Sequence, residues 1–288
     1  MNQEVVEKIH HAVLDMMKKV RINDKHIYTA TDTNEWLQGV SSVSSIIPKD
    51  WLSAWGAKEA VKFLGYSDYE GDTKLAVETL DKITSMTEPE EFIALLKEAK
   101  GASARKSKKA LVDGKKGHEW LEEFVKAKIR GTELPKIPID ALKHPVEQFL
   151  EWETKNISQW VLSEARVCNL EKKYAGTMDA LAFTKEGKVA IIDFKFASHI
   201  SEDYYLQTAG YQACFESYGI QIDERIIIRL PKTVEKEEWD DKKRKYKIVP
   251  NNIEVEIVKT SYEFDRDTFF HALPVKKWIN QFTKNGTY

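Results

Sequence analysis

The chain has 288 residues, of which 42% are hydrophobic, enough for one large domain or a domain with a substantial extension. Lysine and arginine nearly balance aspartate and glutamate, and the net charge of −2 excludes a strongly basic nucleic-acid coat, so any anion-binding surface must come from local clustering. The only two cysteines, Cys168 and Cys214, exclude a disulfide framework and an iron–sulfur cluster with four thiolates. We expect a soluble, cytoplasmic protein, because we find no signal-peptide pattern and no apolar run of the roughly 20 residues that span a bilayer.

The first hundred residues are expected to form a mainly helical N-terminal extension. Its helices are expected over 1–22, after Pro48, at about 72–86 and over 88–100. Residues 26–48 are rich in Thr, Ser and Val, which favours short strands and turns. On the helix after Pro48, Trp51 and Trp55 are four residues apart, and they either belong to a core or form an exposed stacking platform.

The strongest change in composition lies between Lys100 and Lys116, where there are seven Lys or Arg residues and one Asp. This basic segment leads into HEWLEEFVKAKIRG, whose apolar residues recur at helical spacing. A second helix is expected over about 139–156.

From about residue 160 the pattern becomes that of strands. Strands are expected in WVLSEARVC, GTMDALAF and KVAIIDFKFA, and the turn TKEGK joins the last two. A helix (EDYYLQTAGYQACFESYG), a strand (ERIIIRLPK), one or two strands within KRKYKIVPNNIEVEIVKT and a closing helix follow. This order predicts an α/β core over 101–288, with a central mixed sheet flanked by helices.

Acidic side chains and a lysine interrupt the otherwise apolar strands of this core. Side chains alternate along a strand, so Asp193 and Lys195 project from one face of KVAIIDFKFA, and the opposite, wholly apolar face must be covered by helices. The short turn makes the preceding strand an antiparallel neighbour, which places Asp179 opposite or diagonal to Asp193. Such positions are about 5 Å or about 7–8 Å apart, a spacing that suits two carboxylates sharing one divalent cation.

Two interpretations of these three residues are open. In the first, Lys195 partly neutralises the carboxylates in a structural ion-pair cluster. In the second, a metal ion resolves the repulsion between the carboxylates. Hard oxygen ligands select Mg²⁺ or Mn²⁺, and the lysine would then hold or deprotonate the attacking water.

Four short motifs, taken in order, carry a family resemblance. GKKGH ends at His118, GTMD ends at Asp179, DFK spans 193–195 and QTAGY spans 207–211. They resemble the Gly-x-x-x-His, Gly-x-x-Asp, Asp/Glu-x-Lys and Gln-x-x-x-Tyr series of the PD-(D/E)XK nuclease superfamily. The branch they resemble is that of the RecB-like exonucleases, which includes enzymes of the mitochondrial genome maintenance exonuclease type and phage exonucleases. The resemblance covers about residues 110–230, and VSSVSSII (40–47) resembles a Ser-Val-Thr element of the same proteins.

The sequence departs from the superfamily pattern at two points. Met178 precedes Asp179, where the superfamily's name implies proline, although this departure is frequent in the RecB-like branch. The absence of a cysteine cluster argues against the members that carry an iron–sulfur cluster. The resemblance implies a restriction-endonuclease-like core over 101–288, to which residues 1–100 add an extension that shapes the substrate entrance.

The resemblance also implies a role for each matching residue. His118, Asp179 and Asp193 would bind one or two Mg²⁺ or Mn²⁺ ions together with the main-chain carbonyl of Phe194. Lys195 would orient and activate water. The alternative for His118 is a solvated residue in the first turn of a helix.

Three further residues are candidates for catalysis. Gln207 and Tyr211 lie four apart on one helix face, and the resemblance implies that they hold the site or the scissile phosphate, with ordinary helix–sheet packing as the alternative. Glu164 falls on the strand before Asp179, where similar nucleases often have a glutamate near the site, with a surface glutamate as the alternative.

The basic segment 100–117 is the best candidate for contacts with nucleic-acid phosphates. Its basic residues are Arg105, Lys106, Lys108, Lys109, Lys115 and Lys116. A strand held there would be delivered to His118, and a solvated helix face or flexible loop is the alternative. Arg229 is a further candidate. The charged stretch DDKKRKYK (240–247) resembles a hairpin that contacts phosphate or is simply a solvated turn.

Together, the residues and the resemblance predict a metal-dependent DNA exonuclease that acts on single strands or ends in recombination, repair or phage DNA metabolism. DNA and a single-strand annealing or binding protein are the expected partners, in the host cytoplasm if the chain is phage-encoded. The rivals are a non-catalytic DNA-binding or recombination-partner module that keeps the fold, a restriction-type endonuclease, and an α/β domain with a structural ion cluster.

Overall fold

The structure is a computed structural model, and it describes residues 3–66, 74–240, 242 and 245–284. The chain divides into two compact units. Unit 1 holds residues 1–47, 117–231 and 252–288, and unit 2 holds residues 48–116 and 232–251. This division differs from the boundary expected near residue 100, because the first 47 residues pack with the second half of the chain.

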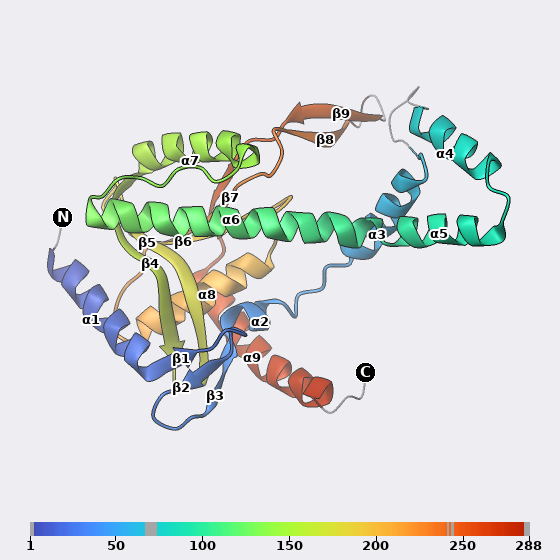
Figure 1. Cartoon of the computed structure of the whole chain (residues 1–288). Coiled ribbons are helices and arrows are strands. Elements are labelled where there is room, and N and C mark those ends of the chain that lie inside the picture. Colours follow the sequence, from blue (N-terminus) through green and yellow to red (C-terminus); the bar gives the residue numbers. More distant parts are fainter. Residues whose placement is uncertain (1–2, 67–73, 241, 243–244, 285–288) are drawn as a thin grey trace. The chain divides into compact units, whose positions relative to one another are not determined.

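Within the described residues, unit 1 contains an eight-stranded sheet with helices on both faces (Figure 1). Its strands are β1 (Val20–Ile22), β2 (Tyr28–Ala30), β3 (Trp36–Gly39), β4 (Ile157–Asn169), β5 (Tyr174–Thr184), β6 (Val189–Lys195), β7 (Glu224–Arg229) and β10 (Glu254–Ile257). Its helices are α1 (Gln3–Lys19), α2 (Val40–Ser44), the 3-10 helix η1 (Asp140–Leu142), α7 (Lys143–Asn156), α8 (Asp203–Glu216) and α9 (Tyr262–Lys284). Helix α6 (Ala102–Arg130) begins in unit 2 and ends in unit 1. The predicted α/β fold with a central mixed sheet is thereby confirmed.

The sheet runs in the order β1-β2-β3-β5-β6-β7-β10, and β4 pairs with β5 along its length. β5 and β6 form the predicted antiparallel hairpin. β6 and β7 are parallel and are connected by α8, while β3 pairs in parallel with the start of β5, Gln38 opposite Tyr174. The stretch 40–47, expected among short strands, instead begins with α2, whose Val40 and Val43 are buried at helical spacing.

Alternation along β6 separates two apolar cores. Ala190 and Ile192 lie in the core that α7 and the second part of α6 cover, whereas Ile191 lies in the core shared with α1, α2, α8 and α9. The prediction that helices cover the wholly apolar face of this strand is confirmed. Asp193 and Lys195 share the face of Ile191, toward α8.

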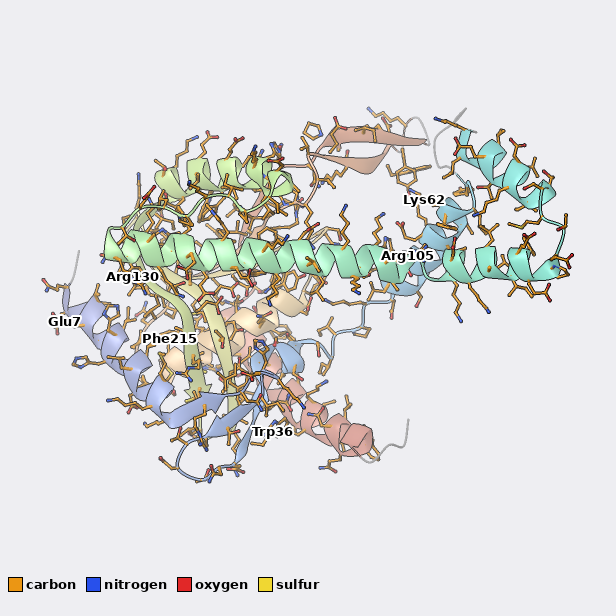
Figure 2. All side chains as sticks on the ribbon, viewed as in Figure 1. Glu7, Trp36, Lys62, Arg105, Arg130 and Phe215 are labelled. Atoms are coloured by element: carbon orange, nitrogen blue, oxygen red, sulfur yellow. The ribbon has the colours of Figure 1, made fainter. Side chains whose placement is uncertain are left out.

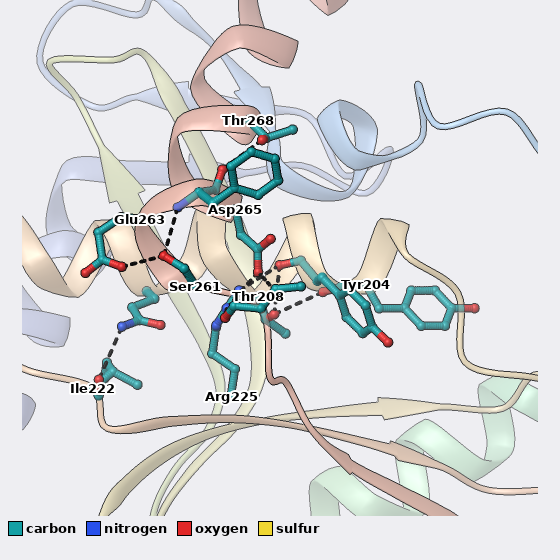
Figure 3. A network of polar contacts seen from close by, with 12 residues as sticks. Tyr204, Thr208, Ile222, Arg225, Ser261, Glu263, Asp265 and Thr268 are labelled. Carbon is teal, nitrogen blue, oxygen red and sulfur yellow. Dashed lines mark hydrogen bonds and ion pairs between the residues drawn. The ribbon is translucent and has the colours of Figure 1, made fainter.

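A buried ion pair joins α8, β7 and α9 (Figure 3). Arg225 of β7 contacts Asp265 of α9, with 2.7 Å between Nη2 and Oδ2 and exposed fractions of 4% and 6%. The same guanidinium donates hydrogen bonds to the main-chain carbonyls of Tyr205 in α8 and Thr260 before α9. Because the buried charges are paired and hydrogen-bonded, the network fixes the start of α8 against the sheet.

Unit 2 consists of helices and a hairpin. It contains α3 (Trp51–Phe63), α4 (Lys74–Thr84), α5 (Pro89–Lys100), the first part of α6, and the two-stranded sheet of β8 (Glu235–Asp240) and β9 (Lys245–Pro250). The basic segment is not a connection before a helix, because α6 is one continuous helix of 29 residues. The charged stretch 240–247 falls at the β8–β9 turn, and its residues 241, 243 and 244 lie outside the described residues.

In the part of the chain that the structure describes, no helix combines the length and the apolar character that crossing a membrane requires.

Candidate active site

Two aspartates lie opposite each other where β5 and β6 stop pairing through their backbones. The last backbone pair joins Ala180 to Ile192, so Asp179 and Asp193 take the next opposite positions and share one face. There the Oδ2 atom of Asp179 accepts a hydrogen bond from the main-chain N–H of Phe194 at 2.7 Å. Of the two arrangements that the sequence predicted, opposite and diagonal, this register, continued past its last pair, gives the opposite one.

Lys195 lies on the same face and contacts Asp193. Its Nζ is 2.9 Å from Oδ1 and 2.7 Å from Oδ2 of the carboxylate, and hydrogen-bond geometry is met toward Oδ1. The ammonium also lies 4.9 Å from the ring centroid of Tyr204 in α8. The exposed fractions are 15% for the Lys195 side chain and 1% for the Asp193 side chain. The lysine is therefore a largely buried cation between a carboxylate and an aromatic face.

Burial and mutual repulsion set the charges of these groups. The pKa of Asp193 is raised to about 6, mainly by burial and also by the charge of Asp179, while Lys195 and His118 act in the opposite direction. Burial also raises the pKa of Asp179. For Lys195, burial alone would lower the pKa, but the attraction of both carboxylates outweighs it and raises the pKa above its usual value. Lys195 is therefore a cation at neutral pH, which suits it to hold an anion or a water rather than to accept a proton.

Glu164 brings a third carboxyl group to this face. The register of β4 against β5 places it opposite Asp179, and its φ of 48° lies in the left-handed region, which is uncommon for a residue in a strand. Its pKa is raised to about 8, mainly by burial and also by the nearby carboxylates of Asp179 and Glu122 of α6, while Lys126 and Lys195 act in the opposite direction. The glutamate is half-buried, and it lies within electrostatic range of Asp179.

Helix α8 turns two of the predicted residues toward the aspartates. Gln207 donates a hydrogen bond from Nε2 to Oη of Tyr211 at 3.0 Å, and both residues are buried. Burial raises the pKa of Tyr211 well above its usual value, and Asp193 and Asp179 raise it further, so the hydroxyl lies within electrostatic range of both carboxylates. Tyr211 is therefore neutral and can donate a hydrogen bond into the site.

Two glycines make room for this arrangement. A Cβ at Gly176 would lie 2.7 Å from Cε1 of Tyr211 and 3.0 Å from Cβ of Val40. A Cβ at Gly117 would lie 2.2 Å from Cζ of Phe196, so α6 reaches the end of β6 only because this position has no side chain. In the Gly-x-x-x-His motif the glycine is Gly114. The glycine that allows α6 to approach Phe196 is instead Gly117.

His118 lies beside the end of β6. Its ring packs edge-on against Phe196, with centroids 5.2 Å apart and an interplanar angle of 68°. It lowers the pKa of Asp193, which places it within electrostatic range of that carboxylate. Among the residues that the structure describes, no three His, Cys, Asp or Glu side chains are grouped closely enough to hold a metal ion. A metal site formed by His118, Asp179 and Asp193 therefore stays a prediction.

The two aspartates alone fit the chemistry of Mg²⁺ or Mn²⁺. Their oxygens are hard donors, and a bound cation would relieve the burial that raises both pKa values and the repulsion by Asp179 that adds to the pKa of Asp193. Protein sites for Mg²⁺ commonly supply one or two carboxylates and leave the other positions to water and substrate phosphate. The main-chain carbonyl of Phe194 stays a predicted ligand.

Sequence reasoning missed two tyrosines at the site. Tyr204 precedes Gln207 by three residues and Tyr211 by seven, a helical spacing that could have indicated it. Oη of Tyr28 lies 3.0 Å from Oγ1 of Thr177, which shares the face of Asp179. Tyr28 belongs to β2, and no local pattern in the sequence connects that strand to the site.

The predicted phosphate contacts fall into two groups. The first group lies on the first part of α6, and all of its side chains are exposed: Arg105 (labelled in Figure 2), Lys106, Lys108, Lys109, Lys115 and Lys116. One of them, Lys106, forms an ion pair with Glu59 of α3 at 2.8 Å. Arg229 is only 1% exposed, and its guanidinium binds Glu254 and the main-chain carbonyl of Asn252. Arg229 therefore holds β7 to β10 and does not face a ligand.

No protein-family model and no curated protein matches this sequence.

Proposed function

We propose that this chain is a metal-dependent DNA exonuclease with a restriction-endonuclease-like core, of the RecB-like branch of the PD-(D/E)XK superfamily. One observation carries the proposal: Asp179, Asp193 and Lys195 meet on one buried face of β5 and β6, at the motif spacing of that superfamily. Gln207 and Tyr211 of α8 lie within reach of the same face, which adds the family's helical motif to the cluster.

The proposed reaction is hydrolysis of a phosphodiester bond. A Mg²⁺ or Mn²⁺ ion held by Asp179 and Asp193 would polarise the scissile phosphate and activate water. Lys195, already a cation, would position the phosphate or the attacking water and offset the negative charge that develops in the transition state. The neutral hydroxyl of Tyr211, held by Gln207, would donate a hydrogen bond toward the same oxygens. The exposed lysines of α6 are the proposed contacts for the DNA backbone.

One observation favours a second candidate, the non-catalytic DNA-binding module. The Nζ atom of Lys195 contacts both oxygens of Asp193, so the pair already neutralises a buried charge without a metal ion. A structural ion pair of this kind needs no bound cation. The two candidates differ in their response to a chelator. A chelator should abolish hydrolysis by the nuclease, whereas the binding module should bind DNA equally well with and without it.

The test uses single-stranded DNA that carries a label at either end, incubated with Mg²⁺, Mn²⁺ or chelator. We expect metal-dependent shortening, and a rate about 10²–10³-fold lower for Lys195→Ala, the loss typical when one charge-stabilising donor is removed. Lys188→Ala is the matched control, because Lys188 precedes the first residue of the same strand and pairs with Glu224. Absence of cleavage by the folded wild-type protein with either metal would leave the binding module as the function.

Circular substrates distinguish the exonuclease from the restriction-type endonuclease. An exonuclease needs an end, so a closed circular single strand and a supercoiled duplex should both persist while linear strands are shortened. Nicking of the supercoiled duplex at a rate comparable with that on linear DNA would support the endonuclease instead.

A further inference from the structure

We propose that unit 2 carries a base-stacking surface for a single nucleic-acid strand, formed by aromatic side chains of α3 and of the β8–β9 hairpin with lysines between them. The ligand named here is the substrate of the proposed function, so this inference deepens that function.

Helix α3 leaves several apolar side chains exposed. None of its residues is buried in the described structure, and Trp51, Leu52 and Val61 are 44%, 44% and 46% exposed. The sequence left open whether Trp51 and Trp55 belong to a core, and the structure places Trp51 at the surface and Trp55 half-buried. An apolar surface of this kind on a small helical unit indicates a binding site.

Two lysines follow the two tryptophans along one side of α3. Trp51, Trp55, Lys58 and Lys62 follow one another at intervals of four, three and four residues, which places all of them on one helix face. Lys62 is labelled on α3 in Figure 2. The face therefore presents ring surfaces and ammonium groups together, whereas a face made to enter a protein core would be apolar throughout.

The hairpin continues this surface. Trp239 of β8 and Tyr246 of β9 are cross-strand partners, with ring centroids 5.1 Å apart in an edge-to-face arrangement. The Nζ atom of Lys58 lies 4.3 Å from the ring centroid of Tyr246, which joins the hairpin to the α3 face. Trp239 is 46% exposed, so its indole is accessible to a planar ligand.

The chemistry of this surface favours a single strand over other partners. Unpaired bases have aromatic faces that stack on Trp and Tyr, and the phosphates between them are attracted to lysines at the same surface. A duplex hides its base faces in its own stack, and so it offers only phosphates to the lysines. A second copy of this chain would bring the same lysines against one another, which is unfavourable.

The test measures binding in chelator, so that no hydrolysis contributes. The probe is a fluorescein-labelled oligothymidylate, followed by anisotropy, with a blunt duplex of the same length as competitor. We expect Trp239→Ala and Trp51→Ala each to weaken binding about fivefold or more, the effect of losing one stacked base. Trp239→Phe should keep most of the affinity and Trp239→Leu should not, because only phenylalanine retains an aromatic face.

The matched control is Trp278→Ala, since Trp278 is an exposed tryptophan (59%) on α9 in unit 1, and it should bind like the wild type. Trp51 is 44% exposed and lies outside the hairpin, so Trp51→Ala tests the surface even if a hairpin variant fails to fold. Equal binding by wild type, Trp239→Ala and Trp51→Ala would overturn the inference, as would equal affinity for the duplex, or a dimer of the wild type that these variants dissociate. Single-strand binding through Trp239 without any hydrolysis would instead refute the proposed function and leave this inference standing.

Discussion

Replacing Glu164 with glutamine should make the protein more stable at pH 8 and leave its stability much less changed at pH 5. The folded protein raises the pKa of this carboxyl group to about 8, from an ordinary value of 4.5. The folded state therefore binds the proton more tightly than the unfolded state. The resulting stabilisation is fully present below the unfolded pKa and is lost as the pH rises through the folded pKa. Glutamine never ionises, so the variant should escape this loss.

The size of the effect follows from the two pKa values. Each pKa unit of difference between the folded and unfolded states is worth about 1.4 kcal/mol. Between pH 5 and pH 8, ionisation of Glu164 should cost the wild type roughly 3 kcal/mol relative to Glu164→Gln. The raised pKa of Asp193, about 6, adds a loss of the same sign. That loss is common to both proteins, so it should largely cancel in the comparison.

The assay is urea unfolding of both proteins at pH 5 and pH 8, with chelator present, read as the free energy of unfolding. Glu133→Gln is the control, because Glu133 is exposed in the segment after α6 and its replacement should change little at either pH. If the difference between wild type and Glu164→Gln is the same at both pH values, ionisation of Glu164 does not cost folding energy, and the reasoning from its burial fails.

Three further outcomes are expected. Gly176→Ala should destabilise the fold by about 1–3 kcal/mol and lower activity, because the added Cβ would press on the ring of Tyr211, and thermal unfolding beside a nuclease assay measures both. Arg225→Met should cost about 3–5 kcal/mol in urea unfolding by leaving Asp265 buried and unpaired, and adding Asp265→Leu should recover much of that loss; no recovery in the double variant would contradict the pairing argument. Mg²⁺ or Mn²⁺ at about 100 times its dissociation constant should stabilise the wild type by about 2.7 kcal/mol and Asp193→Asn by much less. The measurement is the shift in melting temperature on adding the metal, and equal shifts for the two proteins would show that Asp193 does not bind the metal.

The parts of the site that could be predicted are those set by local periodicity. The two-residue repeat of β6 was enough to place Asp193 and Lys195 on one face and to require helices over the other. The short turn after β5 then fixed Asp179 beside them, because hairpin pairing follows from the loop. The prediction that Gln207 and Tyr211 share one helix face is confirmed by their hydrogen bond, since a helix face depends only on spacing along the chain.

The parts that could not be predicted depend on contacts between distant segments or on ambiguous composition. Tyr28 reaches the site through β3, whose pairing with β5 leaves no local signal. The helix was expected to begin at about His118, yet α6 already runs through Gly114 and Gly117 before it, and Gly117 allows the close approach to Phe196. The strand β8 has the sequence EKEEWD, whose charges give no strand pattern. Arg229 was predicted to contact phosphate because its partner, Glu254, is on another strand, and no local pattern in the sequence indicates that pairing.

The pairing of β3 with β5 also sets the timing of folding during synthesis. Gln38 leaves the ribosome 136 residues before its partner Tyr174. At about 5–20 residues per second, roughly 7–27 s pass before that partner exists. For most of this interval the apolar face of α1, with Ile9, Val13 and Met16, lacks β4, the strand against which it packs. We expect the nascent chain to be most vulnerable to aggregation in this interval, and protection by a chaperone there to raise the yield of folded protein more than protection at any later stage.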